Sequence, residues 1–174
     1  MNVKTHVVLL GLTLCLTVLS VAAGSLLPAP AWRMKVDWIT DVTDDRKLVG
    51  VCHHVFVGRV VARAWTSQSN GDLPDTEFRV QVVQNIKGNL AGTVIVKQSG
   101  GWAGRALHLF GDDPLLTVGK SYLFVTRQGP AWQRPVPGYG DIPINSEAEM
   151  AALVQRFTEA VQHEVPWPDS VINP

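Results

Sequence analysis

Cys52, His53 and His54 are adjacent, and their side chains are of the types that serve as nucleophiles, general bases and metal ligands. In an extended strand, neighbouring side chains point to opposite faces, so Cys52 and His54 share a face at a separation of roughly 6–7 Å. That separation is too long for proton transfer between a thiol and an imidazole. We therefore expect these residues to pack in a strand or at its edge. A metal- or thiol-dependent hydrolase using Cys52 and His54 is the alternative.

Two other segments have the composition of ligand-binding loops. Residues 99–104 are glycine-rich but lack the G-x-G-x-x-G spacing of a phosphate loop, so we expect a flexible loop there. Gly111-Asp112-Asp113-Pro114 predicts a turn, with an ion site as the alternative, since calcium would want carboxylates at alternate positions. No G-x-S-x-G, H-E-x-x-H, Walker or C-x-x-C motif occurs. We predict no enzyme, no catalytic or metal residues and no cofactor.

The cysteine–histidine group lies in the segment Val49–Trp65, which is rich in β-branched residues and follows a charged turn over residues 41–47. Before Gly58 apolar side chains fall on both faces, and after it arginines occupy alternate positions. The pattern predicts a long strand that is buried on two sides and then on one. A glycine at the changeover permits a bend or a close backbone approach, as a small closed barrel requires.

Further strands are predicted downstream. Residues 76–86 alternate apolar and polar side chains, which is typical of a half-buried strand antiparallel to the first, and residues 93–98 continue the sheet. Residues 121–126 are apolar on both faces, so this strand should be central. Residues 133–144 contain three prolines, so any strand there should be short and at an edge.

One helix is predicted over residues 146–163. Ser146 and Glu149 form a capping-box pattern at its start. Apolar residues then recur at helical spacing on one side, which favours packing against the barrel. The prolines at 166 and 168 end the helix, and a loose tail follows.

Four of these segments together resemble a known family. They are V-F-V-G-R-V-V at 55–61, F-R-V-Q-V-V-Q-N-I-K-G at 78–88, T-V-I-V at 93–96 and V-G-K-S-Y-L-F-V at 118–125. Their order and spacing resemble bacterial members of the TIMP-like/netrin-like group over roughly residues 49–126. The resemblance implies a five-stranded OB-type barrel with a packed helix, and by itself no activity.

The resemblance does not extend to protease inhibition. The animal inhibitors of that group depend on an N-terminal cysteine pair, whereas this chain has two cysteines, Cys15 and Cys52, and none near the expected mature start. Cys52 matches a cysteine that precedes the first strand in the group, but its disulfide partner is missing. Metalloproteinase inhibition by that route is therefore not expected.

The N-terminus predicts export. Lys4 precedes an apolar core at 7–19 and small residues at 20–24, which is typical of a signal peptide. The uncharged stretch 7–27 also approaches the roughly 20 residues of a membrane anchor, and lipidation at Cys15 is a third possibility. All three place the remainder outside the cytoplasmic membrane, secreted or tethered at the surface. The expected organisation is signal or anchor at 1–31, barrel at 32–145, and helix with tail at 146–174.

The chain has 15 basic and 15 acidic residues, and this neutrality argues against a nucleic-acid binder. We therefore expect a non-enzymatic exported module that recognises an extracellular protein or envelope component through its barrel loops. Trp65, Trp102 and Trp132 are the predicted binding residues, because aromatic side chains dominate contact energetics.

Overall fold

A computed structural model describes residues 31–34, 41–68 and 74–167. The signal or anchor predicted over residues 1–31 therefore lies, apart from Ala31, outside the described residues, as does most of the C-terminal tail. Within the described ranges, no helix is both long and apolar enough to cross a membrane.

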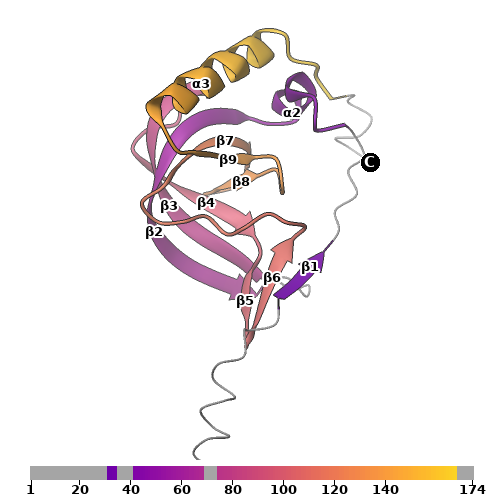
Figure 1. Cartoon of the computed structure of the whole chain (residues 1–174), viewed down its shortest axis with the longest axis vertical. Coiled ribbons are helices and arrows are strands. Elements are labelled where there is room, and N and C mark those ends of the chain that lie inside the picture. The colour runs from indigo at the N-terminus through magenta and orange to yellow at the C-terminus, as the bar shows by residue number, and fades with distance from the viewer. Residues whose placement is uncertain (1–30, 35–40, 69–73, 168–174) are drawn as a thin grey trace, which may run out of the picture. The chain divides into compact units, whose positions relative to one another are not determined.

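Five strands form a closed barrel, as predicted (Figure 1). They pair in the order β2 (His54–Gln68), β3 (Pro74–Lys87), β4 (Thr93–Ser99), β8 (Gln133–Pro135) and β7 (Ser121–Gln128). Antiparallel pairing of β2 with β7, from His54↔Thr126 to Arg59↔Ser121, closes the ring. A further strand, β9 (Asp141–Ile144), adds to β7. The protein is mainly β with a C-terminal helix.

The segment before β2 corrects one prediction. The helix α2 (Asp45–Gly50) forms there. It replaces the end of the predicted charged turn and the beginning of the predicted strand. Asp44 caps this helix by accepting a hydrogen bond from the Arg46 backbone N–H at 3.0 Å. Leu48 and Val49 on this helix are buried in the hydrophobic core. The burial of these side chains outweighs the strand preference that the sequence pattern indicated.

Gly58 has the role in β2 that the sequence indicated. The β2–β3 register shifts between Val57 and Gly58. A Cβ atom at Gly58 would come within 2.5 Å of Val80 Cγ1 and 3.2 Å of a Phe124 ring carbon. The glycine therefore allows the two strands and the aromatic core to approach closely.

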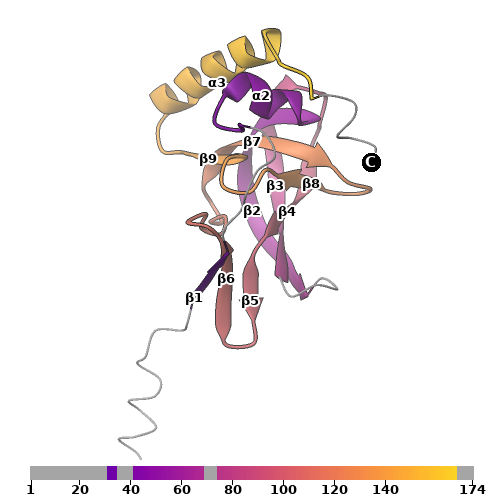
Figure 2. The same ribbon diagram turned by 90° about the vertical axis from the view of Figure 1, so that its right-hand side faces the viewer.

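A second sheet of three strands was not predicted. Its order is β1 (Ala31–Met34), β6 (Ala106–Phe110) and β5 (Gly101–Ala103), and Figure 2 shows β5 and β6 as a hairpin. The prediction of a flexible loop at 99–104 was therefore wrong. Gly104 takes a φ of +59° at the turn, a conformation that favours glycine and lets the chain reverse tightly.

The proline-rich segment 133–144 forms two strands in place of one. Both are short, as predicted, and β9 is at an edge. The edge prediction was wrong for β8, which lies between β4 and β7. Pro135 is tolerated there because β8 has only three residues and a single register pair with β4.

Strand β7 is central, as predicted, because its two faces belong to different hydrophobic clusters. Leu123 and Val125 pack with α2 and the C-terminal helix, whereas Tyr122 and Phe124 pack inside the barrel with Phe56. The Phe56 and Phe124 rings stack at 5.1 Å between centroids. Continuous apolar character is therefore required along the whole strand.

The predicted helix is α3 (Glu147–Gln162), with Ser146 as its N-cap. Ser146 Oγ accepts from the Glu149 backbone N–H at 3.2 Å, while the Glu149 carboxylate accepts from the Asn145 backbone N–H at 2.8 Å. Leu153 and Phe157 are buried against the barrel. These contacts attach α3 to the outside of the barrel, beside α2 (Figure 1).

We expect Phe157→Ala to lower the free energy of unfolding by about 3–5 kcal/mol, because it leaves a cavity at a side chain that is 0% exposed. Gln155→Ala, at an exposed site of the same helix, should change it by less than about 0.5 kcal/mol. Urea denaturation measures both. Equal effects of the two substitutions would contradict the packing of α3.

Candidate functional site

Cys52 lies in the helix-side core and is 5% exposed. Burial raises the pKa of its thiol to about 12, so it is protonated at neutral pH. A protonated, buried thiol is a poor nucleophile and a poor metal ligand. The structure therefore gives no support to a thiol-dependent site at this residue.

The neighbouring histidines point to separate partners. His54 is 7% exposed, and its Nδ1 lies 2.9 Å from Oε1 of Gln133. His53 is exposed, and its Nδ1 accepts a hydrogen bond from the Gln128 backbone N–H at 3.1 Å. Burial, followed by the charge of Arg127, lowers the pKa of His53. The described residues contain no group of three or more His, Cys, Asp or Glu side chains placed to hold a metal.

Trp65 stands on the outer surface of the barrel and is 63% exposed. It lies opposite Glu77 on β3, and Glu77 lies opposite Lys97 on β4. Directly opposed residues share a face of the sheet. We call this surface the outer β2–β3 face and define it by the residues on its two strands: Arg59, Val61, Ala62, Trp65, Glu77, Arg79, Gln81 and Val83.

Two further apolar side chains are exposed on this face. Val61 and Val83 sit at register shifts of the β2–β3 pair and are 47% and 57% exposed. Bulges commonly re-aim side chains in this way. Together with Trp65 they give the face an apolar surface that the described part of the chain leaves uncovered.

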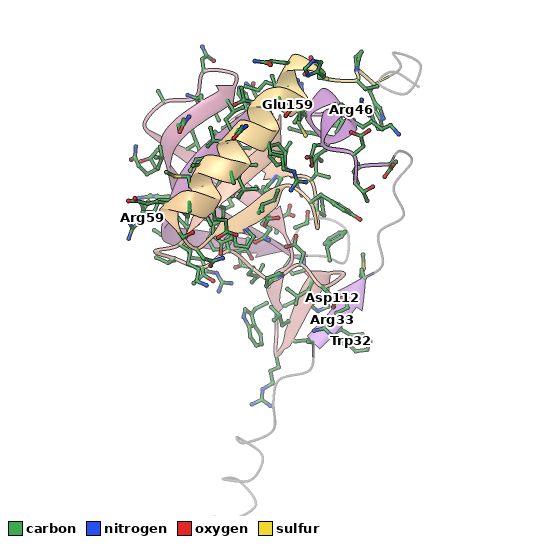
Figure 3. All side chains as sticks on the ribbon, turned by 45° about the horizontal axis from the view of Figure 1, so that its top comes forward. Trp32, Arg33, Arg46, Arg59, Asp112 and Glu159 are labelled. Carbon is green, nitrogen blue, oxygen red and sulfur yellow. The ribbon has the colours of Figure 1, made fainter. Side chains whose placement is uncertain are left out.

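The outer β2–β3 face also carries positive charge without compensation. Glu77 lies 3.7 Å from Lys97 Nζ, but Arg59 and Arg79 form no ion pair with any described residue. Arg59 projects away from the ribbon in Figure 3. Exposed aromatic and arginine side chains are the types enriched at protein interfaces.

Trp132 lies just before β8 and is half-buried. Its ring packs against the Gly129 backbone, with the Arg134 guanidinium 5.0 Å and Lys97 Nζ 5.8 Å from the ring centroid. Arg134 in turn pairs with the Asp75 carboxylate at 2.8 Å. Much of the Trp132 surface is therefore used within the barrel wall, which leaves it less area for a partner than Trp65 has.

Trp102 lies on β5 and is 43% exposed. It is opposite Leu107 on β6, whereas Trp32 on β1 is opposite His108. Adjacent residues on β6 face opposite ways, so Trp102 and Trp32 occupy opposite faces of the three-stranded sheet. Trp102 therefore lies on a different sheet from Trp65, and Trp132 lies just before β8 of the barrel, so the structure does not bring the three predicted binding residues together.

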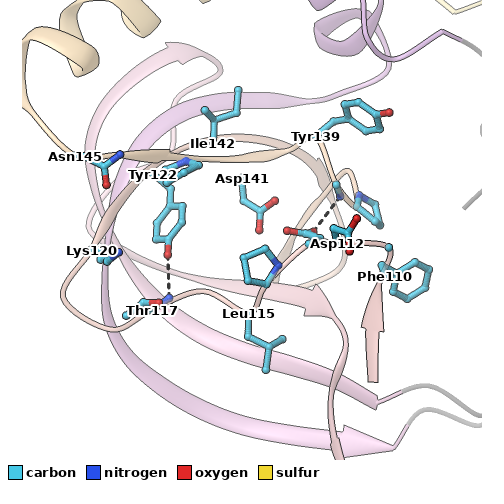
Figure 4. Close-up of a pocket in the computed structure, with 16 residues that line it drawn as sticks. Phe110, Asp112, Leu115, Thr117, Lys120, Tyr122, Tyr139, Asp141, Ile142 and Asn145 are labelled. Atoms are coloured by element: carbon cyan, nitrogen blue, oxygen red, sulfur yellow. Dashed lines mark hydrogen bonds between the residues drawn. The ribbon is translucent and has the colours of Figure 1, made fainter. Parts of the chain in front are cut away.

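A cavity of about 750 Å³ opens between residues 110–122, which lead from β6 into β7, and residues 137–145, which lead into and along β9 (Figure 4). We call it the loop cavity. Its walls include Phe110, Leu115, Tyr122, Tyr139 and Ile142. Tyr122 is held in place because its hydroxyl accepts the Thr117 backbone N–H at 3.0 Å.

Three aspartates line the loop cavity: Asp112 is exposed, whereas Asp113 and Asp141 are half-buried. Asp141 Oδ2 accepts from Gln98 Nε2 at 2.8 Å, and Asp113 Oδ2 accepts from the Gly138 backbone N–H at 3.0 Å. Asp141 as a residue is half-buried, but its carboxyl contacts Gln98, which is 3% exposed in the barrel interior. We therefore treat this carboxyl as buried.

Burial also shifts the pKa values of the Asp113 and Asp141 carboxyls, which we call the acid pair. It raises the pKa of the Asp141 carboxyl well above its usual value, and the charge of Asp113 raises it further. Burial also raises the pKa of Asp113, against the hydrogen bond from Gly138. The two carboxyls are therefore costly to ionise together.

Sequence reasoning missed the acid pair. Around Asp113 the sequence predicts a turn, with an ion site as the alternative, and Asp141 lies in a proline-rich segment with no recognised motif. They are 28 positions apart in the printed sequence (141 minus 113), so no local spacing relates them. They come together because β9 pairs with β7 and Gln98 bonds both the Pro114 carbonyl and Asp141.

Neither the protein-family models nor the curated proteins contain a match to this chain.

The burial of Cys52 predicts that iodoacetamide will not alkylate it in the folded protein at mildly alkaline pH. Unfolding in urea should increase the rate at least ~100-fold, because the thiol then regains an ordinary pKa. Peptide-resolved mass spectrometry separates Cys52 from Cys15. Rapid alkylation of Cys52 in the folded state would contradict its place in the core.

We expect Asp141→Asn to raise the free energy of unfolding near neutral pH by on the order of 1 kcal/mol. A raised folded-state pKa means that the carboxyl favours folding below its unfolded pKa and loses this contribution as pH rises through the folded pKa. The gain from asparagine should therefore shrink toward about pH 4. Urea denaturation across this range measures it, with exposed Asp112→Asn as the control. A gain that does not change with pH would contradict the buried acid.

Proposed function

We propose that this protein is an exported, non-enzymatic binding module that recognises an acidic protein surface through the outer β2–β3 face. The observation that carries the proposal is the exposure of Trp65 on the same face as two arginines that have no ion-pair partner among the described residues. A large aromatic side chain supplies contact area at low entropic cost, and unpaired arginines favour an acidic partner.

The apolar surface around Trp65 supports a protein partner over a small ion or a charged polymer alone. Val61 and Val83 are exposed on the same two strands, Val61 between the positions that pair with Gln81 and Arg79, and Val83 two residues beyond Gln81. Apolar, aromatic and arginine side chains on one exposed face are typical of a protein interface. The neutral charge of the whole chain makes a general attraction to nucleic acid a weaker explanation.

Export and family membership are parts of the same proposal. The apolar segment with its small-residue end at 7–24 supports export. The order of strands followed by a capped helix, with the quoted motifs on β2, β3, β4 and β7, supports a TIMP-like/netrin-like relationship. Whether the module is released or stays tethered through residues 7–27 depends on cleavage of that segment.

The alternative, a hydrolase using Cys52 and His54, gains no support from the geometry. The thiol is buried with a raised pKa, and the His54 ring is engaged by Gln133.

The proposal is tested by placing the photo-crosslinker p-benzoylphenylalanine at position 65 and irradiating intact producing cells. We expect a defined protein adduct from position 65 and none from position 118, where Val118 is also exposed, at 52% against 63% for Trp65, but lies on the β6–β7 segment. Mass spectrometry of the adduct identifies the partner class. A glycan adduct, or equal labelling from both positions, would contradict a protein-binding face.

Charge complementarity gives a second measurement with the partner so identified. Arg59→Glu with Arg79→Glu should weaken binding by roughly tenfold or more and reduce its salt dependence, because each arginine faces an acidic surface. Arg105→Glu, at the exposed β5–β6 turn, is the control for each single charge reversal and should leave affinity unchanged. If the control weakens binding equally, the attraction is not specific to this face.

A further inference from the structure

We propose that the loop cavity binds a small ligand that carries a primary ammonium group on an apolar body, with the Asp113 and Asp141 carboxyls receiving the ammonium. The site is separate from the outer β2–β3 face, so either proposal can fail without the other. Three features support it: the shape of the cavity, its aromatic walls and the unbalanced acid pair.

The cavity has the dimensions of a small-molecule site. Its volume of about 750 Å³ falls within the usual range of roughly 300–1,000 Å³ for ligand pockets. Figure 4 shows the Asp141 side chain directed into the space between Tyr122 and the segment that carries Asp112. Such pockets combine apolar walls with a few polar groups that fix orientation.

The Asp141 carboxyl has an oxygen left free to accept a hydrogen bond from a ligand. Gln98 is the one described residue that hydrogen-bonds to Asp141, and it engages Oδ2, so Oδ1 receives no hydrogen bond from the described part of the chain. The Gln98 amide is itself fully used, because it also donates to the Pro114 carbonyl and accepts from the Leu116 backbone N–H. The Asp141 carboxyl is therefore oriented by a rigid neighbour.

The acid pair has no cation opposite it among the described residues. Lys120 is the one basic side chain that lines the cavity, and it is exposed and forms no ion pair with Asp113 or Asp141. Two carboxyls in one partly dry cavity repel each other, and a positive charge between them relieves the repulsion. An ammonium group supplies that charge together with three hydrogen-bond donors.

The walls favour an organic cation over a metal ion. Phe110, Tyr122 and Tyr139 offer aromatic surface to an alkyl or aryl body and to the cation itself. A divalent metal would instead require more oxygen or nitrogen ligands than this pair supplies, and no set of three such side chains is grouped in the described ranges.

The pH dependence follows from the same groups. The titratable and charged residues around the pair are Asp112 and Lys120 on the β6–β7 segment, Tyr122 on β7 and Tyr139 before β9. Asp112 is exposed and lies 3.4 Å from Arg33. A bound ammonium competes with the protons held by Asp113 and Asp141, so affinity should rise with pH from about pH 5 to about pH 8, where the amine stays charged.

The test uses 2-phenylethylamine as probe and 2-phenylethanol as its neutral isostere, with the full chain and two-dimensional ¹⁵N NMR. We expect the amine to shift backbone signals of residues 111–122 and 138–144 and to bind roughly tenfold or more tightly than the alcohol. Asp141→Asn should remove this preference, whereas Glu147→Gln, which neutralises an exposed carboxylate on α3 outside the cavity lining, should retain it.

Three results would overturn the proposal: equal binding of amine and alcohol, an amine preference that survives in both Asp141→Asn and Asp113→Asn, or displacement of the amine by millimolar Ca²⁺. If Asp141→Asn alters the fold, as judged from its NMR spectrum, Asp113→Asn takes its place. Amine shifts on β2 and β3 around Trp65 in place of the cavity would also contradict it.

Discussion

Pairing of β2 with β7 is the interaction on which the rest of this structure depends. It closes the barrel. In a closed barrel, one face of each strand lines the interior and the other face points outward. Because β7 has apolar side chains on both faces, it can serve the interior and the helix-side core at once. Cys52 and His54 fall next to this junction and are buried by it. Of the residues that first suggested chemistry, His54 is thus part of the barrel wall and Cys52 part of the helix-side core.

Barrel closure also determines which side chains stay available to bind a partner or a ligand. The outer sides of β2 and β3 are covered by neither helix at the level of Trp65, so its ring faces solvent, as do Arg59 and Arg79 on the same face. On the inside, Gln98 holds the β6–β7 segment against β9 and brings Asp113 near Asp141. Burying two acids reduces stability at neutral pH. Such a cost is commonly retained at sites that bind a ligand.

The sequence predicted elements whose signal is local and periodic. The long strand with Gly58 at its changeover, the alternating strand at 76–86 and the capped helix after Ser146 belong to this class. Prediction from the sequence failed where tertiary contacts determine the local structure. The six-residue helix α2 forms because Leu48 and Val49 reach the core, and the glycine-rich segment becomes β5 because β6 lies beside it. Of the predicted binding residues, Trp65 is exposed on an open face, but Trp132 is half enclosed by Arg134 and Gly129. The acid pair depends on a contact across 28 residues (141 minus 113), which no motif records.

The central claim is that the protein acts by binding through an outer barrel face. Hydroxyl-radical footprinting of the protein on producing cells, compared with the purified protein, tests it even while the partner is unidentified. The account predicts that oxidation of Trp65 is strongly reduced on the cell, while oxidation of Trp102, on the other sheet, is little changed. Equal oxidation of Trp65 in the two settings would contradict the claim.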